Sequence, residues 1–213
     1  MRVLYTAVAA LAAVAAVPAV AAPTIGNTGI DTNWKVAFLG DTATTPTNAQ
    51  ASATGGLTTA TVVTTMVNNW IASDSVSKWV STSARASSQP GYYVYSNTFT
   101  ASAADMLSFN FAVDDKVTRV LLNGNTVNGV SGGGYQSFTA GSVSGLSNGL
   151  NTLTFLISNN FPGQNANINP SGFRFQTTAA VPEPGTWMMM LGGFGVIGLT
   201  MRSRRTTSKK AIA

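Results

Sequence analysis

Apolar and polar residues alternate along short segments in the middle of the chain. In Met106–Val113, the apolar positions of this alternation are Leu107, Phe109, Phe111 and Val113. Successive side chains of a strand point to opposite faces, so this pattern predicts a strand with one face in a core. Similar patterns predict strands at Tyr92–Phe99, Val117–Leu122, Leu150–Ser158 and Phe173–Gln176. In the strand Tyr92–Phe99, Tyr93 and Tyr95 share one face while Tyr92 and Val94 share the other, which leaves one pair free to be exposed.

Turn signals separate these strands at intervals typical of a sandwich. The dipeptide Asn123-Gly124 is a hairpin-turn signal, and Gly129–Gly134 predicts a flexible turn. Asp41–Ala60 is expected to form a long loop or irregular edge. Thr58–Asn69 favours a strand, and Ala72–Val80 is compatible with one helical turn. We therefore predict an all-β fold, a single antiparallel, jelly-roll-like β-sandwich over residues 22–178.

The N-terminus has the features of a secretory signal peptide. A positive start, Met1-Arg2, precedes the apolar stretch Ala7–Val20, which Pro18 interrupts. Small residues at Ala19 and Ala21 suit signal cleavage after Ala21. Residues 1–21 are therefore predicted to be removed during export.

The C-terminal segment, residues 179–213, combines a short polar motif, an apolar stretch and a basic tail. The motif is Val181-Pro182-Glu183-Pro184, residues 186–201 are uncharged and include Trp187, and the tail 202–210 contains Arg202, Arg204 and Arg205. A helix over Trp187–Met201 would span roughly 22 Å at ~1.5 Å per residue, which is short of a ~30 Å bilayer core. The prolines keep the preceding motif extended. These features predict a marginal helical anchor beside an exposed peptide that suits a processing enzyme.

This segment resembles a PEP-CTERM sorting domain. The resemblance implies that the chain is the substrate of an exosortase, a membrane enzyme that removes or replaces the C-terminal helix during export. It implies a transient inner-membrane anchor followed by a cell-surface or extracellular location, with Glu183 as a recognition residue. The basic tail is longer than usual for the family, and an ordinary transmembrane anchor is the alternative interpretation.

Composition excludes several functions for the mature domain. The whole chain carries a formal charge of +5, but residues 22–180 contain six Lys or Arg and six Asp, so the basicity belongs to the targeting segments and nucleic acid is not an expected partner. The chain has no His and no Cys, and its one Glu is Glu183. These absences exclude Ser-His-Asp chemistry and a typical zinc site. Asp114 and Asp115 are expected to form a turn with both side chains in water. We therefore predict that the protein is not an enzyme.

The order of aromatic and Asn-Gly segments from Trp70 to Phe175 resembles the galactose-binding-domain-like jelly roll of carbohydrate-binding modules. The resemblance implies a fold and leaves the ligand open, because such folds carry many functions. No cofactor is expected, apart from a possible structural Ca²⁺ of the kind that these jelly rolls often hold. The weak candidate ligands are Asp31, Asn33 and Asp41.

Aromatic side chains are the remaining candidates for a binding site, because a sugar ring can stack on them. The candidate glycan-binding residues are Tyr135, Trp34, Trp70 and Trp79. Core packing is the favoured alternative for each tryptophan, whereas Tyr135 lies in a Gly-rich loop. Two functions follow. The first is an exported, non-catalytic surface or extracellular-matrix protein that binds exopolysaccharide. The second is a purely structural or adhesive surface protein without a defined sugar site.

Overall fold

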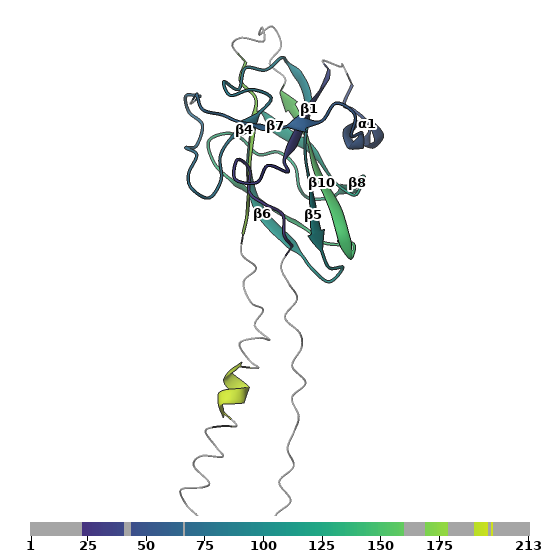
Figure 1. Ribbon diagram of the computed structural model, residues 1–213, viewed down its shortest axis with the longest axis vertical. Coiled ribbons are helices and arrows are strands. Elements are labelled where there is room, and N and C mark those ends of the chain that lie inside the picture. Colours follow the sequence, from purple (N-terminus) through teal and green to yellow (C-terminus); the bar gives the residue numbers. More distant parts are fainter. Residues whose placement is uncertain are drawn as a thin grey trace, which may run out of the picture.

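Two antiparallel sheets form the folded part of the protein (Figure 1). The computed structural model describes residues 23–40, 44–65, 67–159, 169–178, 190–195 and 197. One sheet has the strand order β2-β1-β5-β10-β7-β8. Its strands are β1 (Lys35–Gly40), β2 (Thr58–Thr59), β5 (Gly91–Ala101), β7 (Lys116–Leu122), β8 (Asn125–Val127) and β10 (Gly149–Asn159). The other has the order β3-β4-β11-β6-β9, formed by β3 (Thr61–Val62), β4 (Val80–Ser81), β6 (Leu107–Asp114), β9 (Thr139–Val143) and β11 (Gly172–Thr177).

The path of the chain alternates between the two sheets. β4, β6, β9 and β11 belong to the five-stranded sheet, whereas β5, β7 and β10 belong to the six-stranded sheet. The central pairs of each sheet thus join strands that are distant in sequence. The longest pairing joins β5 to β10 along their full lengths, from Gly91 opposite Asn159 to Ala101 opposite Gly149. The predicted all-β antiparallel sandwich is confirmed.

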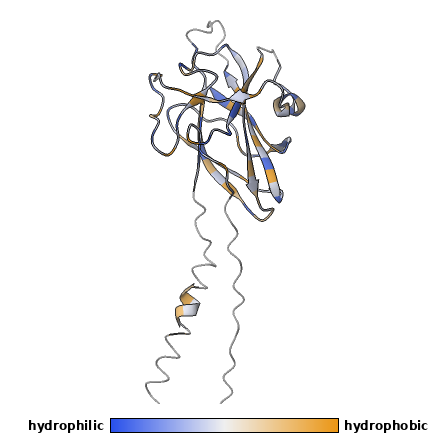
Figure 2. Ribbon diagram, in the orientation of Figure 1, coloured by the Kyte–Doolittle hydropathy of each residue, from blue (hydrophilic) through white to orange (hydrophobic). Residues whose placement is uncertain are grey.

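The core lies between the sheets and is rich in aromatic rings. Phe109, Phe111 and Phe155 are at most 1% exposed, and the alternation predicted for β6 and β10 places its apolar residues in this core. Figure 2 shows hydrophobic and hydrophilic segments following one another along the strands. Trp34 packs among these phenylalanines, with ring centroids 4.9 Å from Phe175 and 5.4 Å from Phe173. Burial of these large rings provides the main favourable term in folding.

A second layer covers the outer face of the six-stranded sheet. Its buried residues are Ala37, Ala51, Tyr92, Val94, Leu121 and Leu156. Ala51 comes from the helix α1 (Asn48–Ser52), which begins with a capping box between Thr47 and Gln50. Both tyrosine faces of β5 are therefore buried: Tyr93 and Tyr95 in the central core, and Tyr92 and Val94 in this second layer. The expected loop at Asp41–Ala60 contains α1 and β2 among its described residues.

A third layer covers the outer face of the five-stranded sheet. It consists of Val63, Trp70, Trp79, Ala86 and Ala112. The strand expected over Thr58–Asn69 is confined to the short β2 and β3, and Ala72–Val80 contains no helical turn. Instead, the irregular segment 67–79 packs Trp70 and Trp79 against the sheet, with their ring centroids 4.2 Å apart.

Both ends of the sandwich domain lie at the same end of the sheets. The N–H of Thr24 donates to the carbonyl of Thr100 at the end of β5, and the N–H of Thr178 donates to the carbonyl of Ser108 at the start of β6. Further along, residues 190–195 and 197 are helical, and Leu191 and Phe194 are 66% and 64% exposed. Within the described part of the chain, no helix has the length and apolar character needed to cross a membrane.

Candidate functional site

A groove of about 630 Å³ lies between the edge strands of the two sheets. Its volume falls in the range of about 300–1,000 Å³ that small-ligand sites occupy. We call it the asparagine groove and define it by its lining residues. They are Met106, Leu122, Asn123, Asn125, Thr126, Val127, Asn128, Ser142, Ser144, Gly145 and Ser147.

Uncharged hydrogen-bonding groups dominate this lining. Three asparagines and four hydroxyl residues are among the lining residues, against three apolar residues, and none of the described residues that line the groove is ionisable. An amide both donates and accepts hydrogen bonds, and so does a hydroxyl. Ligand pockets are usually lined mainly by apolar and aromatic groups. The asparagine groove is therefore suited to a polar, well-hydrated ligand.

The β7–β8 hairpin forms one wall of the groove. Asn123 and Gly124 have φ angles of 51° and 82°, as a type I′ turn requires. The hairpin turn predicted from this dipeptide is therefore confirmed. β8 pairs with β7 through Leu122 opposite Asn125 and Val120 opposite Val127. The opposite wall comes from the end of β9 and the loop that follows it, residues 144–147.

A buried amide ties the two walls together. Asn151 is 1% exposed, and its Nδ2 donates to the carbonyls of Ser147 (2.8 Å) and Gly149 (3.0 Å). Its Oδ1 accepts from the N–H of Ser147 (2.8 Å) and from Nδ2 of Asn123 (3.0 Å). The Oδ1 of Asn123 accepts in turn from the N–H of Thr152 (2.8 Å). This satisfied network fixes the shape of the groove before a ligand arrives, which lowers the entropic cost of binding.

Three polar side chains of the lining remain available to a ligand. Asn128, Ser142 and Ser144 are exposed, and their side chains form no hydrogen bond with another described residue. Met106, which directly precedes β6, is 59% exposed and adds an apolar contact surface. The groove thus combines pre-ordered walls with free donors and acceptors.

The structure places the Asp114 carboxyl in a buried environment on the outer face of the five-stranded sheet. Asp114 is the last residue of β6 and is 5% exposed, so the expected exposed turn position is wrong for it. The Asp114–Asp115 peptide bond is cis. Nε1 of Trp70 donates to Oδ2 of Asp114 at 2.9 Å. Burial raises the Asp114 pKa to about 8, with additional increases from the hydrogen bond and charge of Asp115 and an opposing effect of Trp70.

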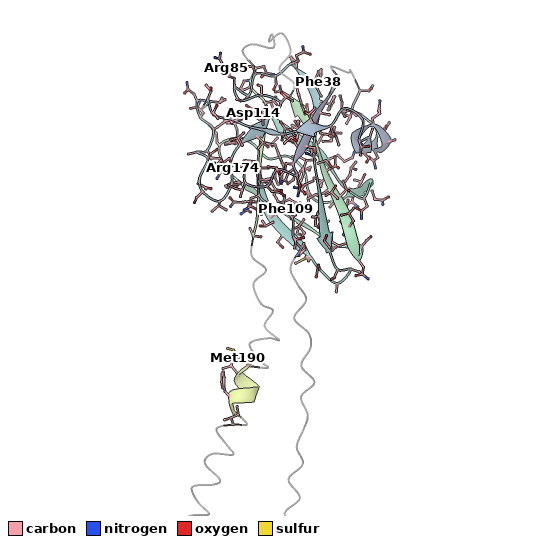
Figure 3. All side chains as sticks on the ribbon, in the orientation of Figure 1. Phe38, Arg85, Phe109, Asp114, Arg174 and Met190 are labelled. Carbon is pink, nitrogen blue, oxygen red and sulfur yellow. The ribbon has the colours of Figure 1, made fainter. Side chains whose placement is uncertain are left out.

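Arg174 lies on the same outer face, two residues along β11 from the partner of Asp114 (Figure 3). Its Nη2 is 2.7 Å from Oδ2 of Asp74, and its Nε donates to Oγ of Ser77 at 2.8 Å. Its Nη1 donates to the carbonyl of Ala72. The guanidinium also sits 4.8 Å from the ring centroid of Phe138. Arg174 therefore fastens the irregular segment 72–77 to the sheet.

The candidate tryptophans have packing roles in the structure. Trp34 and Trp79 are each 1% exposed and Trp70 is 7% exposed. Nε1 of Trp34 donates to the carbonyl of Gly26, and Nε1 of Trp79 donates to the carbonyl of Ile71. Nε1 of Trp70 donates to Oδ2 of Asp114. Such burial favours the core-packing alternative and leaves none of the three rings open for stacking. Tyr135 is half-buried and packs against the Trp70–Trp79 layer.

Of the weak calcium candidates, Asp31 uses both carboxylate oxygens in hydrogen bonds. Oδ1 of Asp31 accepts from the N–H of Asn33 at 2.9 Å, and its Oδ2 accepts from Nδ2 of Asn97 at 3.1 Å. The side chain of Asn33 is exposed, and Asp41 is outside the described residues. Among the residues described, no group of three or more His, Cys, Asp or Glu is placed to hold a metal. The oxygens of Asp31 serve to close its loop.

The signal-cleavage and sorting residues lie outside the described residues. These are Ala19 and Ala21 near the N-terminus, and Val181, Pro182, Glu183, Pro184, Trp187, Arg202, Arg204 and Arg205 near the C-terminus. Residues 180–205 match the family described as the PEP-CTERM protein-sorting motif. The resemblance of the tail to this motif is confirmed. The motif indicates an exported protein that is processed by an exosortase.

Solved structures resemble the sandwich only at low similarity. An FMN-binding beta-glucuronidase from Facaelibacterium prausnitzii L2-6 has a TM-score of 0.35 and 14% identity, over 70% of this chain and only 22% of the enzyme. A family 35 carbohydrate binding module from Clostridium thermocellum has a TM-score of 0.33 and 14% identity, over 56% and 88% of the two chains. A family 35 carbohydrate binding module from an environmental isolate has a TM-score of 0.32 and 13% identity, over 62% of this chain and 96% of the module. TM-scores this low carry no inference about ligand or activity. No curated protein matches the chain significantly.

Proposed function

We propose that the chain is an exported, non-catalytic surface or extracellular-matrix protein that binds polysaccharide in the asparagine groove. The observation that carries this proposal is the lining of the groove by amides and hydroxyls without an ionisable group. A polysaccharide presents hydroxyl groups along its length, and each can both donate to and accept from these side chains. Met106 and Val127 offer apolar surface to the C–H faces of the sugar rings.

The same lining supports a binding role over a catalytic one. General acid–base catalysis needs a titratable side chain within hydrogen-bond reach of the substrate. Within the described part of the chain, the asparagine groove supplies no such group. The Asp114 carboxyl lies elsewhere, against Trp70 on the outer face of the five-stranded sheet. Binding through hydroxyls and amides requires neither a cofactor nor a metal.

A double substitution in the groove tests the proposal. Asn128→Ala with Ser144→Ala is expected to weaken binding of the full-length chain to a polysaccharide ligand roughly tenfold. A hydrogen bond contributes about 0.5–1.5 kcal/mol, and every 1.4 kcal/mol is a factor of ten. Affinity electrophoresis in gels containing polysaccharide measures the change. The matched control is Asn68→Ala, at an exposed asparagine outside the groove.

Two results of this test contradict a polysaccharide site in the groove. One is binding that the double variant leaves unchanged. The other is a chain that binds no polysaccharide and self-associates, which supports the structural or adhesive alternative. The exposed side chain of Leu150, at 71%, is the surface feature that favours this alternative. Both substituted positions are exposed, so the thermal midpoint of the double variant should be little changed.

Processing at both ends is the second part of the proposal. Protein released from cells is expected to begin at Ala22 and to lack Trp187–Ala213, because the signal peptide and the anchor are removed during export. Intact-mass measurement of the released protein checks both ends. Glu183→Ala should leave the C-terminal segment attached and retain the chain in the membrane fraction, whereas Asp74→Ala provides a control outside the motif. A mature wild-type protein that keeps its full-length tail, as the Glu183→Ala variant does, would contradict the sorting interpretation and leave an ordinary anchor.

A further inference from the structure

We infer that the asparagine groove selects an uncharged glycan and discriminates against polyuronates. This inference rests on the proposed function, because it specifies the class of polysaccharide that the same groove accepts. The observation behind it is the placement of charge around the groove. None of the lining residues is Asp, Glu, Lys or Arg.

Several charged residues of the sandwich have their partners away from the groove. Arg174 is buried against Asp74 on the far side of the five-stranded sheet, and Asp114 is covered by Trp70. Lys35 donates to Oγ1 of Thr59 in the β1–β2 pair. The charged residue adjacent to the lining in sequence is an acid, Asp105, which precedes Met106 and accepts from the N–H of Ser102. An anionic chain would therefore meet no complementary charge in the groove.

The nearest cation that hydrogen bonds connect to the lining is Arg119. Its Nη1 donates to the carbonyl of Pro46 and to Oδ1 of Asn48, both at 2.9 Å. Nδ2 of Asn48 then donates to Oγ1 of Thr126, which lines the groove. Arg119 therefore contacts Asn48 and not the lining itself, and it orders Asn48 and, through it, Thr126. The groove itself receives only the neutral amide and hydroxyl ends of this chain of hydrogen bonds.

Desolvation explains the discrimination. A carboxylate that enters a site loses hydration, and this loss is compensated only where a counter-charge or several hydrogen-bond donors replace the water. Neutral hydroxyls exchange water for amides and hydroxyls at little cost. The domain between the targeting segments has six basic and six acidic residues, so no net charge attracts polyanions from a distance. Affinity should consequently depend little on salt.

The experiment compares neutral and anionic polymers on the full-length chain in detergent. Galactomannan and dextran serve as neutral probes, and polygalacturonate and alginate serve as anionic probes, in affinity electrophoresis. We expect at least one neutral polymer to bind at least tenfold more tightly than either polyuronate. Binding to it should change less than about twofold between roughly 0.05 and 0.5 M salt, because screening acts on charge pairs.

A charge-introducing variant makes the test sharper. Asn128→Lys places an ammonium group in the lining and is expected to raise polygalacturonate affinity roughly tenfold, in a salt-sensitive manner. The matched control, Asn68→Lys, adds the same charge at an exposed asparagine outside the groove and should produce no such gain. Both variants should retain the thermal midpoint of the wild type.

The outcomes separate the inference from the function on which it rests. Neutral selectivity would be overturned if the wild type bound a polyuronate more tightly than the neutral polymers. If Asn128→Ala also weakened that binding, the groove would remain the polysaccharide site. No gain in polygalacturonate binding by Asn128→Lys would also count against the inference. Failure of every polymer to bind would overturn the proposed function and, with it, the inference.

Discussion

Arg174→Ala is expected to lower the free energy of unfolding by about 2–5 kcal/mol, the range for truncating a large buried side chain to alanine. Arg174 is 1% exposed and holds Asp74, Ser77 and the carbonyl of Ala72. Its removal leaves a cavity and an unpaired carbonyl, and it releases the segment that carries Trp70 and Trp79. Urea unfolding followed by tryptophan fluorescence measures the loss. The three buried tryptophans of the sandwich make this signal sensitive to loosening of the outer layer.

Two further variants identify the origin of the loss. Arg174→Met retains most of the side-chain volume but none of the polar contacts, so it should lose stability through the unpaired groups alone. Asp74→Asn should cost at most about 1 kcal/mol, because the Asp74 side chain is 52% exposed and exposed ion pairs contribute little. Backbone hydrogen bonds from Ser77 and Val76, with Arg174, lower the Asp74 pKa against the opposing effect of burial. A loss below about 1 kcal/mol for Arg174→Ala would show that the segment is held by tryptophan packing alone.

The strands of the core could be predicted from sequence because their patterns are local. Alternation in β6 and β10 identified both the strands and their buried faces, and Asn123-Gly124 identified the hairpin turn. The capping box of Thr47 and Gln50 was a local signal for α1 that the loop interpretation of Asp41–Ala60 left unused. The two tryptophans of the third layer also had a clear apolar character, although the path of their irregular segment depends on tertiary contacts.

The groove could not be predicted in the same way. Its walls come from residues 123–128 and 142–147, which meet only because β8 and β9 are edge strands of different sheets. A local cue existed in the density of Asn, Ser and Gly in both segments, but such residues are equally typical of turns. The burial of Asp114 was hidden for a related reason. Its adjacency to Asp115 suggested a turn, whereas the covering Trp70 is 44 positions away in sequence.

Asp114→Asn is expected to remove most of the alkaline destabilisation of the sandwich. Burial raises the Asp114 pKa to about 8, against an ordinary value of 3.8. The folded state therefore holds its proton more tightly than the unfolded state does. The resulting stability is fully present below about pH 4 and is lost progressively as the pH rises to about 8. At about 1.36 kcal/mol per pKa unit, the rise from 3.8 to about 8 gives an upper bound of roughly 6 kcal/mol for this loss.

The asparagine amide keeps the shape of the carboxyl, and its oxygen can accept the hydrogen bond from Nε1 of Trp70 without titrating. Urea unfolding between about pH 4 and pH 9 should show a falling free energy for the wild type and a nearly flat profile for Asp114→Asn over the titration range of this group. The two proteins should differ by several kcal/mol at the alkaline limit and by little at the acidic limit. Asp115→Asn provides the matched control: it removes the neighbouring charge and retains the buried Asp114, so its profile should lie between the other two. Equal slopes for wild type and Asp114→Asn would mean that this carboxyl is ionised and hydrated in the folded protein, since only a group that changes its proton affinity on folding can tilt the profile.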